Sequence, residues 1–578
     1  MDNMMSCKEA ADMWNFTERW VSILCKGGKI PGAVKKGHRW MIPSETPRPV
    51  DSRIKTRAYR KEGNSAILPP PLGVTDYVKV CSDYFSVDKT MMIKEFLDTR
   101  AQVSLFLRPR HFGKTLFLDM FRTFFEKTDS DTSRYFLSKA IWSCGEAYRR
   151  HQGAYPVIFL SFRDLRCTSW SETKSRLERL IQNCFLSHPC LSDSDRLPVV
   201  DRELYRSVTE GNASEDELFS SLPALCRMLH MHYDTAPIVM IDDYDTPFIQ
   251  SLQNGYQKEL LYCFQCLLTP VFRDNPNLSF GLMTGVQGVP EGYAGYDLPE
   301  PTVFDITSRQ FSSGFGFTEE EAIRLSAYYN MKNRFDEMNE WFGGYHFGNS
   351  ILLNPWSVLK CISNGGRVQS YWNSTGDIPL FDSLFGFASS GSMEHLQQLL
   401  QNRIIKGPVD LESRGSKDPS TLRECYGRLV KEGYLNILMQ RLRPNGISVY
   451  EMLIPNLETL TSYKKEFLDY LNKKNILAQG PVAMIQEALY SHNPARFQNA
   501  LKQLLYQSIR NNSQSGDEYY QILLTGLMVL TEEYYLVDFV SDTKPDLCSI
   551  QMTAKSDPLP DVRIEINAGK TVKLLYSK

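Results

Sequence analysis

The sequence lacks the features that mark membrane-spanning and secreted proteins. No apolar run approaches the roughly 18 residues that a membrane-spanning helix needs, although 42% of the 578 residues are hydrophobic. The N-terminus has no basic region followed by an apolar stretch, so no secretory signal is expected. These absences favour a cytoplasmic protein that does not enter a membrane.

Cysteine is present, but metal-binding cysteine patterns are missing. The 13 cysteines are scattered and odd in number, which argues against a full disulfide framework. Cys263 and Cys266 form one Cys-x-x-Cys pair inside an apolar helical stretch, without a second pair or a histidine at zinc-like spacing. We interpret this pair as core packing, with a metal or redox role as the alternative.

A strong excess of one charge is also missing, because the formal net charge is −2. This balance hides a difference along the chain. Residues 1–60 contain 12 Lys/Arg and 6 Asp/Glu, a net of +6, which leaves −8 for the other residues. A small basic segment on a mildly acidic chain favours contact with an anion such as nucleic acid, and a solvated basic arm is the alternative.

The basic N-terminal segment carries a helix-turn-helix pattern. Ser6 and Glu9 form a capping-box pattern at the start of a first helix. A second amphipathic helix is predicted from Thr17 to Cys25. The basic turn 35–38, followed by Arg39–Pro43, predicts a small hairpin or wing.

In these residues the segment resembles the small winged helix-turn-helix modules of the MerR and excisionase type. The resemblance implies that residues 1–45 bind DNA, and a protein-binding helical module is the alternative. The residues implied to face the DNA groove are Thr17, Glu18, Arg19 and Ser22, and those implied to approach phosphates are Lys35, Lys36, His38 and Arg39. Residues 46–71 are rich in proline and charge and are expected to form a basic linker.

The run from Arg108 to Thr115 (Arg-Pro-Arg-His-Phe-Gly-Lys-Thr) is typical of a phosphate-binding loop. It follows a strand-like run, Val103–Leu107, and precedes a helical pattern. Backbone N–H groups at a helix start face a bound anion. The lysine of Gly-Lys-Thr reaches the β- and γ-phosphates and the threonine binds Mg²⁺. The usual pattern begins with glycine where this chain has Arg108, and a chance Gly-Lys-Thr at a helix start is the alternative.

Acidic residues directly follow another predicted strand. The run Asp-Asp-Tyr-Asp begins at Asp242, where the first acid is suited to hold Mg²⁺ through water and Asp243 to orient an attacking water. Thr284, at the end of a further strand, is suited to contact the γ-phosphate. Predicted strands alternate with helical stretches, which favours a parallel α/β sheet; the strands are Val103–Leu107, Tyr155–Leu160, Pro237–Ile241 and Ser279–Met283. A turn that caps the next helix is the alternative for the acidic run.

From about residue 72 to residue 567 the chain resembles the AAA-ATPase-like bacterial family, which commonly carries a C-terminal PD-(D/E)xK nuclease-like domain. The motifs that carry the resemblance are Val74–Asp76, Tyr84–Lys89, Arg108–Thr115, Ile241–Pro247 and Phe315–Glu320. Arginine at the start of the loop is typical of this family. The resemblance implies a Walker A loop, a Walker B acid, and ATP and Mg²⁺ as cofactors. The implied nucleotide-binding residues are Arg110, Phe112, Gly113, Lys114 and Thr115, with Thr115 and Asp242 for Mg²⁺ and Lys114 and Asp243 for catalysis.

Two positions depart from the family pattern. Asp243 stands where the family usually has glutamate, and a positional error near 1 Å can cost about 100-fold in rate. The segment Val286–Pro290 lacks the usual arginine, which would stabilise charge in the transition state. We therefore expect ATP binding with slow hydrolysis. The alternative is a non-hydrolysing, nucleotide-dependent DNA-binding regulator, and a homo-oligomer stays open.

The C-terminal part completes a multidomain α/β organisation, for which the length predicts about three or four domains. After the ATPase core (72–317), residues 318–480 are interpreted as a helical lid or middle domain and residues 481–578 as a degenerate or truncated nuclease-like domain. The implied nuclease residues are Glu518, Asp546, Glu565 and Asn567. Asn567 stands where a nuclease has lysine and lacks its positive charge, so an Mg²⁺-dependent DNA nuclease is the weaker alternative.

Overall fold

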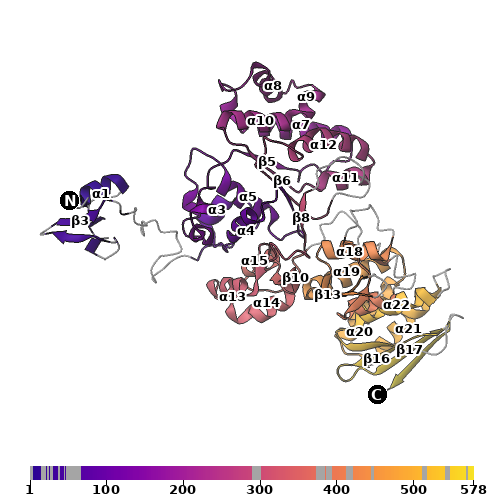
Figure 1. Cartoon of the computed structure of the whole chain (residues 1–578). Coiled ribbons are helices and arrows are strands. Elements are labelled where there is room, and N and C mark those ends of the chain that lie inside the picture. Colours follow the sequence, from indigo (N-terminus) through magenta and orange to yellow (C-terminus); the bar gives the residue numbers. More distant parts are fainter. Residues whose placement is uncertain are drawn as a thin grey trace. The chain divides into compact units, whose positions relative to one another are not determined.

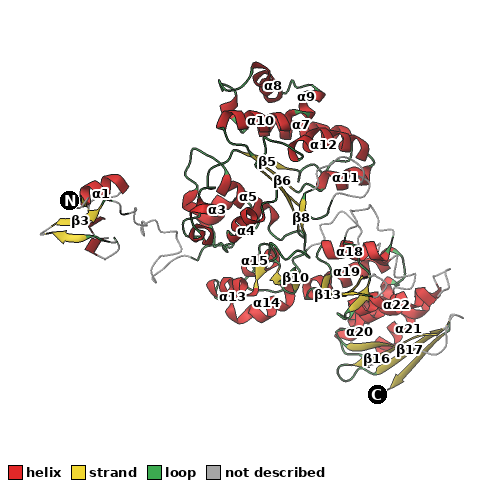
Figure 2. Cartoon of the chain, viewed as in Figure 1, coloured by secondary structure: helices red, strands yellow, loops and turns green. Residues whose placement is uncertain are grey.

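A computed structural model describes most of the chain as two compact units, Met1–Ala66 and Ile67–Lys578 (Figures 1 and 2). The described residues of the first unit are 4–14, 21–22, 25–26, 30, 32–36, 39–44 and 46. Those of the second unit are 67–288, 301–372, 384–385, 393–411, 421–443, 448–510, 517–540, 547–567 and 571–577.

The N-terminal unit packs a helix on a small antiparallel sheet. Its elements are β1 (Met4–Ser6), α1 (Cys7–Trp14), β2 (Val34–Lys36) and β3 (Arg39–Pro43), with strand order β1-β3-β2. The capping box is confirmed, because the Glu9 backbone N–H donates to Ser6 Oγ at 3.3 Å and Ser6 N donates to Glu9 Oε2 at 2.7 Å. The hairpin β2–β3 is confirmed as well. Buried Ala10, Val21 and Ile42 belong to the core of this unit.

A parallel sheet organises the first part of the second unit. The strands are β4 (Val103–Leu107), β5 (Val157–Ser161), β6 (Ile238–Asp242), β7 (Phe280–Gly285) and β8 (Thr302–Phe304), in the order β5-β6-β7-β4-β8. All neighbouring pairs are parallel. The predicted α/β sheet is therefore confirmed, and four of its strands lie within two residues of the predicted bounds. The short β8 was not predicted.

Helices cover both faces of this sheet (Figure 2). Successive side chains of a strand point to opposite faces; in β6, Met240 joins one hydrophobic cluster, whereas Val239 and Ile241 join another. Phe121 of α5 belongs to the first cluster and Leu260 of α12 to the second. The helices are α3 (Tyr77–Asp83), α4 (Met91–Thr99), α5 (Lys114–Phe125), α6 (Glu146–Arg149), α7 (Trp170–Leu186), α8 (Val199–Thr209), α9 (Glu215–Phe219), α10 (Ser221–Tyr233), α11 (Thr246–Asn254) and α12 (Gln257–Phe272).

The region after the parallel sheet mixes helices with small antiparallel sheets. Its helices are α13 (Glu319–Tyr328), α14 (Phe335–Phe342), α15 (Pro355–Ser363), α17 (Met393–Leu400), α18 (Leu422–Lys431) and α19 (Leu457–Lys473). One sheet has the order β10-β11-β9 (Tyr345–Phe347, Ser350–Leu353, Phe317–Thr318), and the other the order β12-β14-β13 (Ile405–Gly407, Ser448–Leu453, Asn436–Leu442). The sequence predicted a mostly helical region, and these strands are the difference.

Three helices and an antiparallel meander form the C-terminal part. The elements are α20 (Gln479–Tyr490), α21 (Pro494–Arg510), α22 (Asp517–Thr531), β15 (Tyr535–Val540), β16 (Leu547–Ala554), β17 (Asp561–Asn567) and β18 (Val572–Ser577). The strands pair in sequence order. Ile564 of β17 and Phe106 of β4 belong to one hydrophobic cluster, so packing is continuous through this unit.

Membrane-spanning helices and the Cys263–Cys266 pair are the two features of the sequence analysis that concern this fold. Within the described ranges, no helix has both the length and the apolar character needed to cross a membrane. Cys263 is buried in α12, and its thiol is free. The part of the chain that the structure describes contains no group of three or more His, Cys, Asp and Glu side chains arranged to hold a metal.

Glu458 is a fully buried acid in α19. Its Oε1 accepts the backbone N–H groups of Tyr371 at 2.6 Å and Trp372 at 2.8 Å. Burial raises the pKa of Glu458 from 4.5 to about 7 despite these hydrogen bonds. The folded protein therefore keeps a proton that the unfolded chain releases above pH 4.5. Because the unfolded state then binds fewer protons, the free energy of unfolding falls as the pH rises from 4.5 to about 7.

Replacing Glu458 with glutamine is expected to remove this contribution to pH dependence. The amide oxygen still accepts both N–H groups, but no proton is released. In the wild type the group lowers the free energy of unfolding by up to roughly 3 kcal/mol between about pH 5 and pH 8. Denaturant unfolding at both pH values measures the difference, and Asp469→Asn on the exposed side of α19 is the surface control. An identical pH slope in Glu458→Gln and wild type would contradict the expectation.

Candidate functional site

The loop between β4 and α5 has the backbone shape of an anion cradle. The fully buried strand β4 leads into it, and α5 begins at Lys114. Gly113 precedes the helix with a left-handed φ of 84°, which glycine adopts without strain. No heavy atom lies within 4 Å of a Cβ built on Gly113, so φ and not space favours glycine. The free N–H groups of the first turn of α5 then face the loop, where an anion is favoured.

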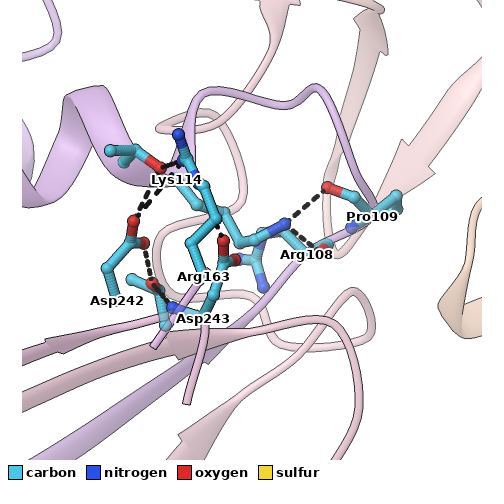
Figure 3. Close-up of polar contacts among 8 residues, drawn as sticks. Arg108, Pro109, Lys114, Arg163, Asp242 and Asp243 are labelled. Carbon is cyan, nitrogen blue, oxygen red and sulfur yellow. Dashed lines mark hydrogen bonds and ion pairs between the residues drawn. The ribbon is translucent and has the colours of Figure 1, made fainter. Parts of the chain in front are cut away.

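Lys114 lies buried at the centre of this loop (Figure 3). Its Nζ donates to the backbone carbonyl oxygens of Arg108 and Pro109, each at 3.1 Å. Burial lowers the pKa of Lys114, and the nearby Asp243 is the largest of the opposing effects. The ammonium group is thus held inside the loop by neutral acceptors that a bound anion can replace.

Thr115, Asp242 and Thr284 meet at the carboxyl ends of the strands. Thr115 Oγ1 donates to Asp242 Oδ2 at 2.8 Å, and Thr284 Oγ1 donates to Asp242 Oδ1 at 2.7 Å. Asp242 is fully buried, and burial followed by the charge of Asp243 raises its pKa, whereas the two hydroxyls lower it. The structure therefore brings together three residues that the sequence placed in separate motifs.

The remaining acids of the run have different surroundings. Asp243 has a left-handed φ of 51° and lines the cavity, and its backbone N–H donates to Thr284 Oγ1 at 3.4 Å. Asp245 is buried, and its Oδ2 accepts the backbone N–H groups of Val286 and Gln287, each at 2.9 Å. Burial raises the pKa of Asp245, and these two hydrogen bonds oppose the shift. Asp245 thus fixes the segment after β7 beside the loop.

Arg163 is a residue of this site that sequence reasoning missed. It follows β5, and its Nη2 donates to Thr115 Oγ1 at 2.5 Å (Figure 3). The same nitrogen lies 3.6 Å from Asp242 Oδ2, and Nε donates to Asp243 Oδ2 at 3.3 Å. The parallel pairing of Ser161 with Asp242 provides the missing signal, because it carries the residues after β5 to the acids after β6.

Arg108 is buried away from the cavity and has a packing role. Its guanidinium donates to the carbonyl oxygens of Leu107, Phe304 and Phe311 at 2.8, 2.7 and 3.2 Å. It also lies 4.8 Å from the ring centre of Phe315. Burial lowers the pKa of Arg108 to about 10, which leaves it charged at neutral pH. The arginine that replaces the usual glycine therefore joins β4 to β8 and to the segment that follows β8.

A cavity of about 500 Å³ opens over the loop. Its polar lining includes the loop, Arg163 and Arg166, and the acids Asp243 and Asp245. Apolar side chains also line it, among them Phe85, Val87, Leu325 and Leu359, and Trp356 stacks on His111 of the loop with ring centres 5.1 Å apart. The predicted nucleotide-binding residues Arg110, Phe112, Gly113, Lys114 and Thr115 all line the cavity, and the ring of Phe112 is buried against Tyr345 with ring centres 4.9 Å apart.

The turn after α18 supplies another part of the cavity wall. Glu432 lines the cavity, and its Oε1 accepts from Gln287 Nε2 at 2.8 Å and from Arg428 Nε at 3.1 Å. The next residue, Gly433, has a φ of 83°, and a Cβ built there would lie 3.1 Å from Pro109 of the loop. Sequence reasoning missed this turn, because nothing in the local pattern relates residues more than 300 positions apart.

The predicted DNA-facing residues are only partly described. Thr17, Glu18, Arg19 and His38 lie outside the described residues. Ser22 is helical and half-buried, and Lys35 is exposed on β2. Lys36 and Arg39 are register partners at the end of the β2–β3 hairpin. The hairpin thus places three predicted phosphate-contacting positions on one small element.

Among the described residues, the predicted nuclease-like residues do not form a common site. Asp546 lies outside the described residues, and Glu518 belongs to α22. Glu565 of β17 accepts from Arg563 Nε at 2.8 Å and lies 3.7 Å from Lys573 Nζ of β18. Asn567 is exposed, and its Oδ1 accepts the backbone N–H of Thr571 at 3.1 Å. Glu565 is thus part of an ion-pair cluster at the sheet.

The segment that contains the Arg108–Thr115 loop is similar to a known protein family. Residues 71–291 match a family described as predicted AAA-ATPase, which confirms the expected resemblance for this part of the chain. The chain is 22% identical over 311 residues to "Uncharacterized protein in vnfD 5'region" of Azotobacter chroococcum mcd 1. That match covers 53% of this chain and 54% of the relative, so the chain spans about half the length of the relative. No solved structure matches the chain.

Proposed function

We propose that the chain binds ATP with Mg²⁺ in the cavity over the Arg108–Thr115 loop, hydrolyses it slowly, and engages DNA through residues 1–45. The observation that carries the ATP site is the meeting of Thr115 Oγ1 with the Asp242 carboxylate, at 2.8 Å, beside the buried Lys114. The match of residues 71–291 to the predicted AAA-ATPase family supports the same nucleotide.

The donor atoms of the site fit Mg²⁺. A hydroxyl oxygen from Thr115 and carboxylate oxygens from Asp242 are the hard ligands that this ion prefers, and few protein ligands suffice because it retains water. Thr284 donates to Asp242 Oδ1, which holds the carboxylate in place. We assign Thr115 and Asp242 to Mg²⁺, with Asp242 acting through water.

The cavity also fits a nucleotide in size and polarity. Its volume of about 500 Å³ lies within the roughly 300–1,000 Å³ of small-molecule sites. The cations Lys114 and Arg110 in its lining suit the phosphates, and apolar lining side chains such as Val87 and Leu359 suit a base. We therefore place the phosphates over the start of α5 and the base against the apolar lining.

The roles of the chain's own groups follow from this placement. Lys114 leaves the carbonyl oxygens of Arg108 and Pro109 and donates to the β- and γ-phosphate oxygens. Bound Mg²⁺ supplies positive charge that neutralises those oxygens. The N–H groups of the first turn of α5 donate to the phosphates without reorganisation. Asp243 is the residue that we assign to orienting the attacking water.

A non-hydrolysing regulator is the second candidate, and the surroundings of Asp243 favour it. The carboxylate of Asp243 accepts from Arg163 Nε at 3.3 Å, which engages the group that would orient water. An aspartate is also one methylene shorter than the glutamate that the loop's family usually has. In this alternative, nucleotide occupancy sets a conformation and the N-terminal unit supplies the DNA contact.

The DNA part of the proposal is supported by charge and by the N-terminal hairpin. Residues 1–60 carry a net charge of +6. Lys35, Lys36 and Arg39 lie on the β2–β3 pair, where cations can approach phosphates. Nuclease activity is not part of the proposal, because Asn567 cannot supply the positive charge that the chemistry needs.

The test uses the whole chain with radiolabelled ATP. We expect ATP to bind in the presence of Mg²⁺, with phosphate release slower than about 1 per second, the lower end of common enzyme turnover. Duplex DNA is expected to change either the nucleotide affinity or this rate. Binding without release would favour the regulator, and an absence of ATP binding would overturn both candidates. A nucleotide response that is the same with and without DNA would contradict the coupling to DNA.

A further inference from the structure

Arg163 lies where a cation is needed among the acids of the site. Its guanidinium contacts Thr115 Oγ1 at 2.5 Å and lies within 3.6 Å of Asp242 Oδ2. Its Nε donates to Asp243 Oδ2 at 3.3 Å. Figure 3 shows the arginine reaching across the two acids toward the start of α5. A single side chain thus contacts every group that the proposed function assigns to Mg²⁺ or to the attacking water.

The acids need this positive charge. Asp242 is fully buried, and an uncompensated buried carboxylate is costly. Lys114 does not contact Asp242 or Asp243 directly in the hydrogen bonds described, because its Nζ donates to the carbonyls of Arg108 and Pro109. Arg163 is therefore the cation in contact with the Thr115 and Asp242 oxygens.

The position of Arg163 conflicts with a metal ion at the same oxygens. Mg²⁺ would use Thr115 Oγ1 directly and Asp242 through water, the same two groups that Arg163 contacts, and like charges this close repel strongly. The guanidinium therefore has to leave before these oxygens can serve Mg²⁺. It has room to do so, because its side chain is 47% exposed and lines the cavity.

We propose that Arg163 occupies the magnesium position when no nucleotide is bound and that its guanidinium moves from Thr115 and Asp242 to the phosphate oxygens when Mg²⁺ and ATP bind. This inference rests on the proposed function. A planar guanidinium suits both roles, because its fork of N–H donors pairs equally well with carboxylate and with phosphate. Without nucleotide the arginine compensates the acids, and with nucleotide bound it supplies the charge that the Val286–Pro290 segment lacks.

The two roles predict opposite effects of one substitution. Arg163→Gln keeps hydrogen-bonding capacity but removes the charge. We expect the affinity for the metal alone to rise about tenfold, because no cation competes for the acids. The affinity for Mg²⁺ with ATP is expected to fall about tenfold, because a charged contact to phosphate is lost. Arg163→Lys keeps the charge and is expected to lie between wild type and Arg163→Gln in both measurements.

Calorimetric titration with Mn²⁺ alone measures the first effect, and titration with a non-hydrolysable ATP analogue plus Mg²⁺ measures the second. Arg179→Ala, an exposed arginine of α7, is the matched control and is expected to change neither. Thermal unfolding of each variant without ligand checks the fold. Unchanged or weaker Mn²⁺ binding by Arg163→Gln would overturn the occupation of the metal position. Unchanged analogue binding would overturn the move to the phosphates.

The outcomes separate this inference from the proposed function. If the wild type binds no ATP analogue, the proposed function fails. The Mn²⁺ titration alone then still decides whether Arg163 competes for the metal position, and the move to phosphate is overturned with the proposed function. If the wild type binds the analogue and Arg163→Gln behaves like Arg179→Ala in both titrations, only the inference about Arg163 fails.

Discussion

Replacing Lys114 with alanine is expected to weaken the binding of ATP with Mg²⁺ by about 100-fold, because hydrogen bonds from a charged donor contribute roughly 1.5–3 kcal/mol each. Lys114 is buried in the loop, and neutral carbonyl oxygens hold its Nζ at 3.1 Å. In the proposed site, binding exchanges these weak partners for phosphate oxygens with full negative charge, so the ammonium is expected to contribute more to the nucleotide-bound protein than to the nucleotide-free protein. Phosphate release is expected to fall at least as far.

Titration with a fluorescent ATP analogue measures the loss. Lys79→Ala, an exposed lysine of α3, is the control and is expected to bind the analogue like the wild type. Unfolding of Lys114→Ala without nucleotide separates a binding defect from a folding defect. The ligand should raise the melting temperature of the wild type and leave that of Lys114→Ala nearly unchanged. Equal affinities for Lys114→Ala and Lys79→Ala would contradict the placement of the phosphates over α5.

Replacing Arg108 with methionine is expected to lower the free energy of unfolding by about 3 kcal/mol. The substitution leaves the carbonyl oxygens of Leu107, Phe304 and Phe311 without the donor that now reaches them. Each buried acceptor without a partner costs roughly 1–3 kcal/mol. Removing a buried charge recovers part of this cost.

Arg108→Met is expected to change ATP affinity much less than stability. The contact of Lys114 with residue 108 uses the backbone carbonyl, which every amino acid retains. Denaturant unfolding and analogue titration on the same preparation separate the two quantities. Arg324→Met on the exposed face of α13 is the control and should change the free energy of unfolding by less than about 0.5 kcal/mol. A large loss of affinity with unchanged stability would show that Arg108 serves the ligand directly.

The sequence was sufficient for the parts of the site that are contiguous in the chain. The phosphate loop could be predicted because strand, turn and helix start follow one another within Val103–Leu116. The meeting of Thr115 with Asp242 could be expected because parallel strands end at the same edge of a sheet, and the structure places these side chains 2.8 Å apart. Arg108 was visible as a departure from pattern, but its packing partners were not.

The parts that could not be predicted depend on pairing across long distances. Arg163 reaches Asp242 only because β5 and β6 pair in parallel with Ser161 beside Asp242. Glu432 reaches Gln287 through packing between elements 145 positions apart. The β10-β11-β9 sheet was missed because its strands are short, down to the two residues Phe317–Thr318, and offer too few positions for an alternating pattern.

Gly433 lies close to Pro109, so the C-terminal half of the chain supports the Arg108–Thr115 loop. Gly433 has no side chain and faces Pro109, whose backbone carbonyl oxygen accepts a hydrogen bond from Lys114 Nζ. A shift of α18 or β13 toward the loop therefore presses on Pro109 with no flexible side chain between them to absorb it. A fragment limited to residues 71–291 would keep the loop and its acids and lose this support, so the shape of the cradle belongs to the assembled unit.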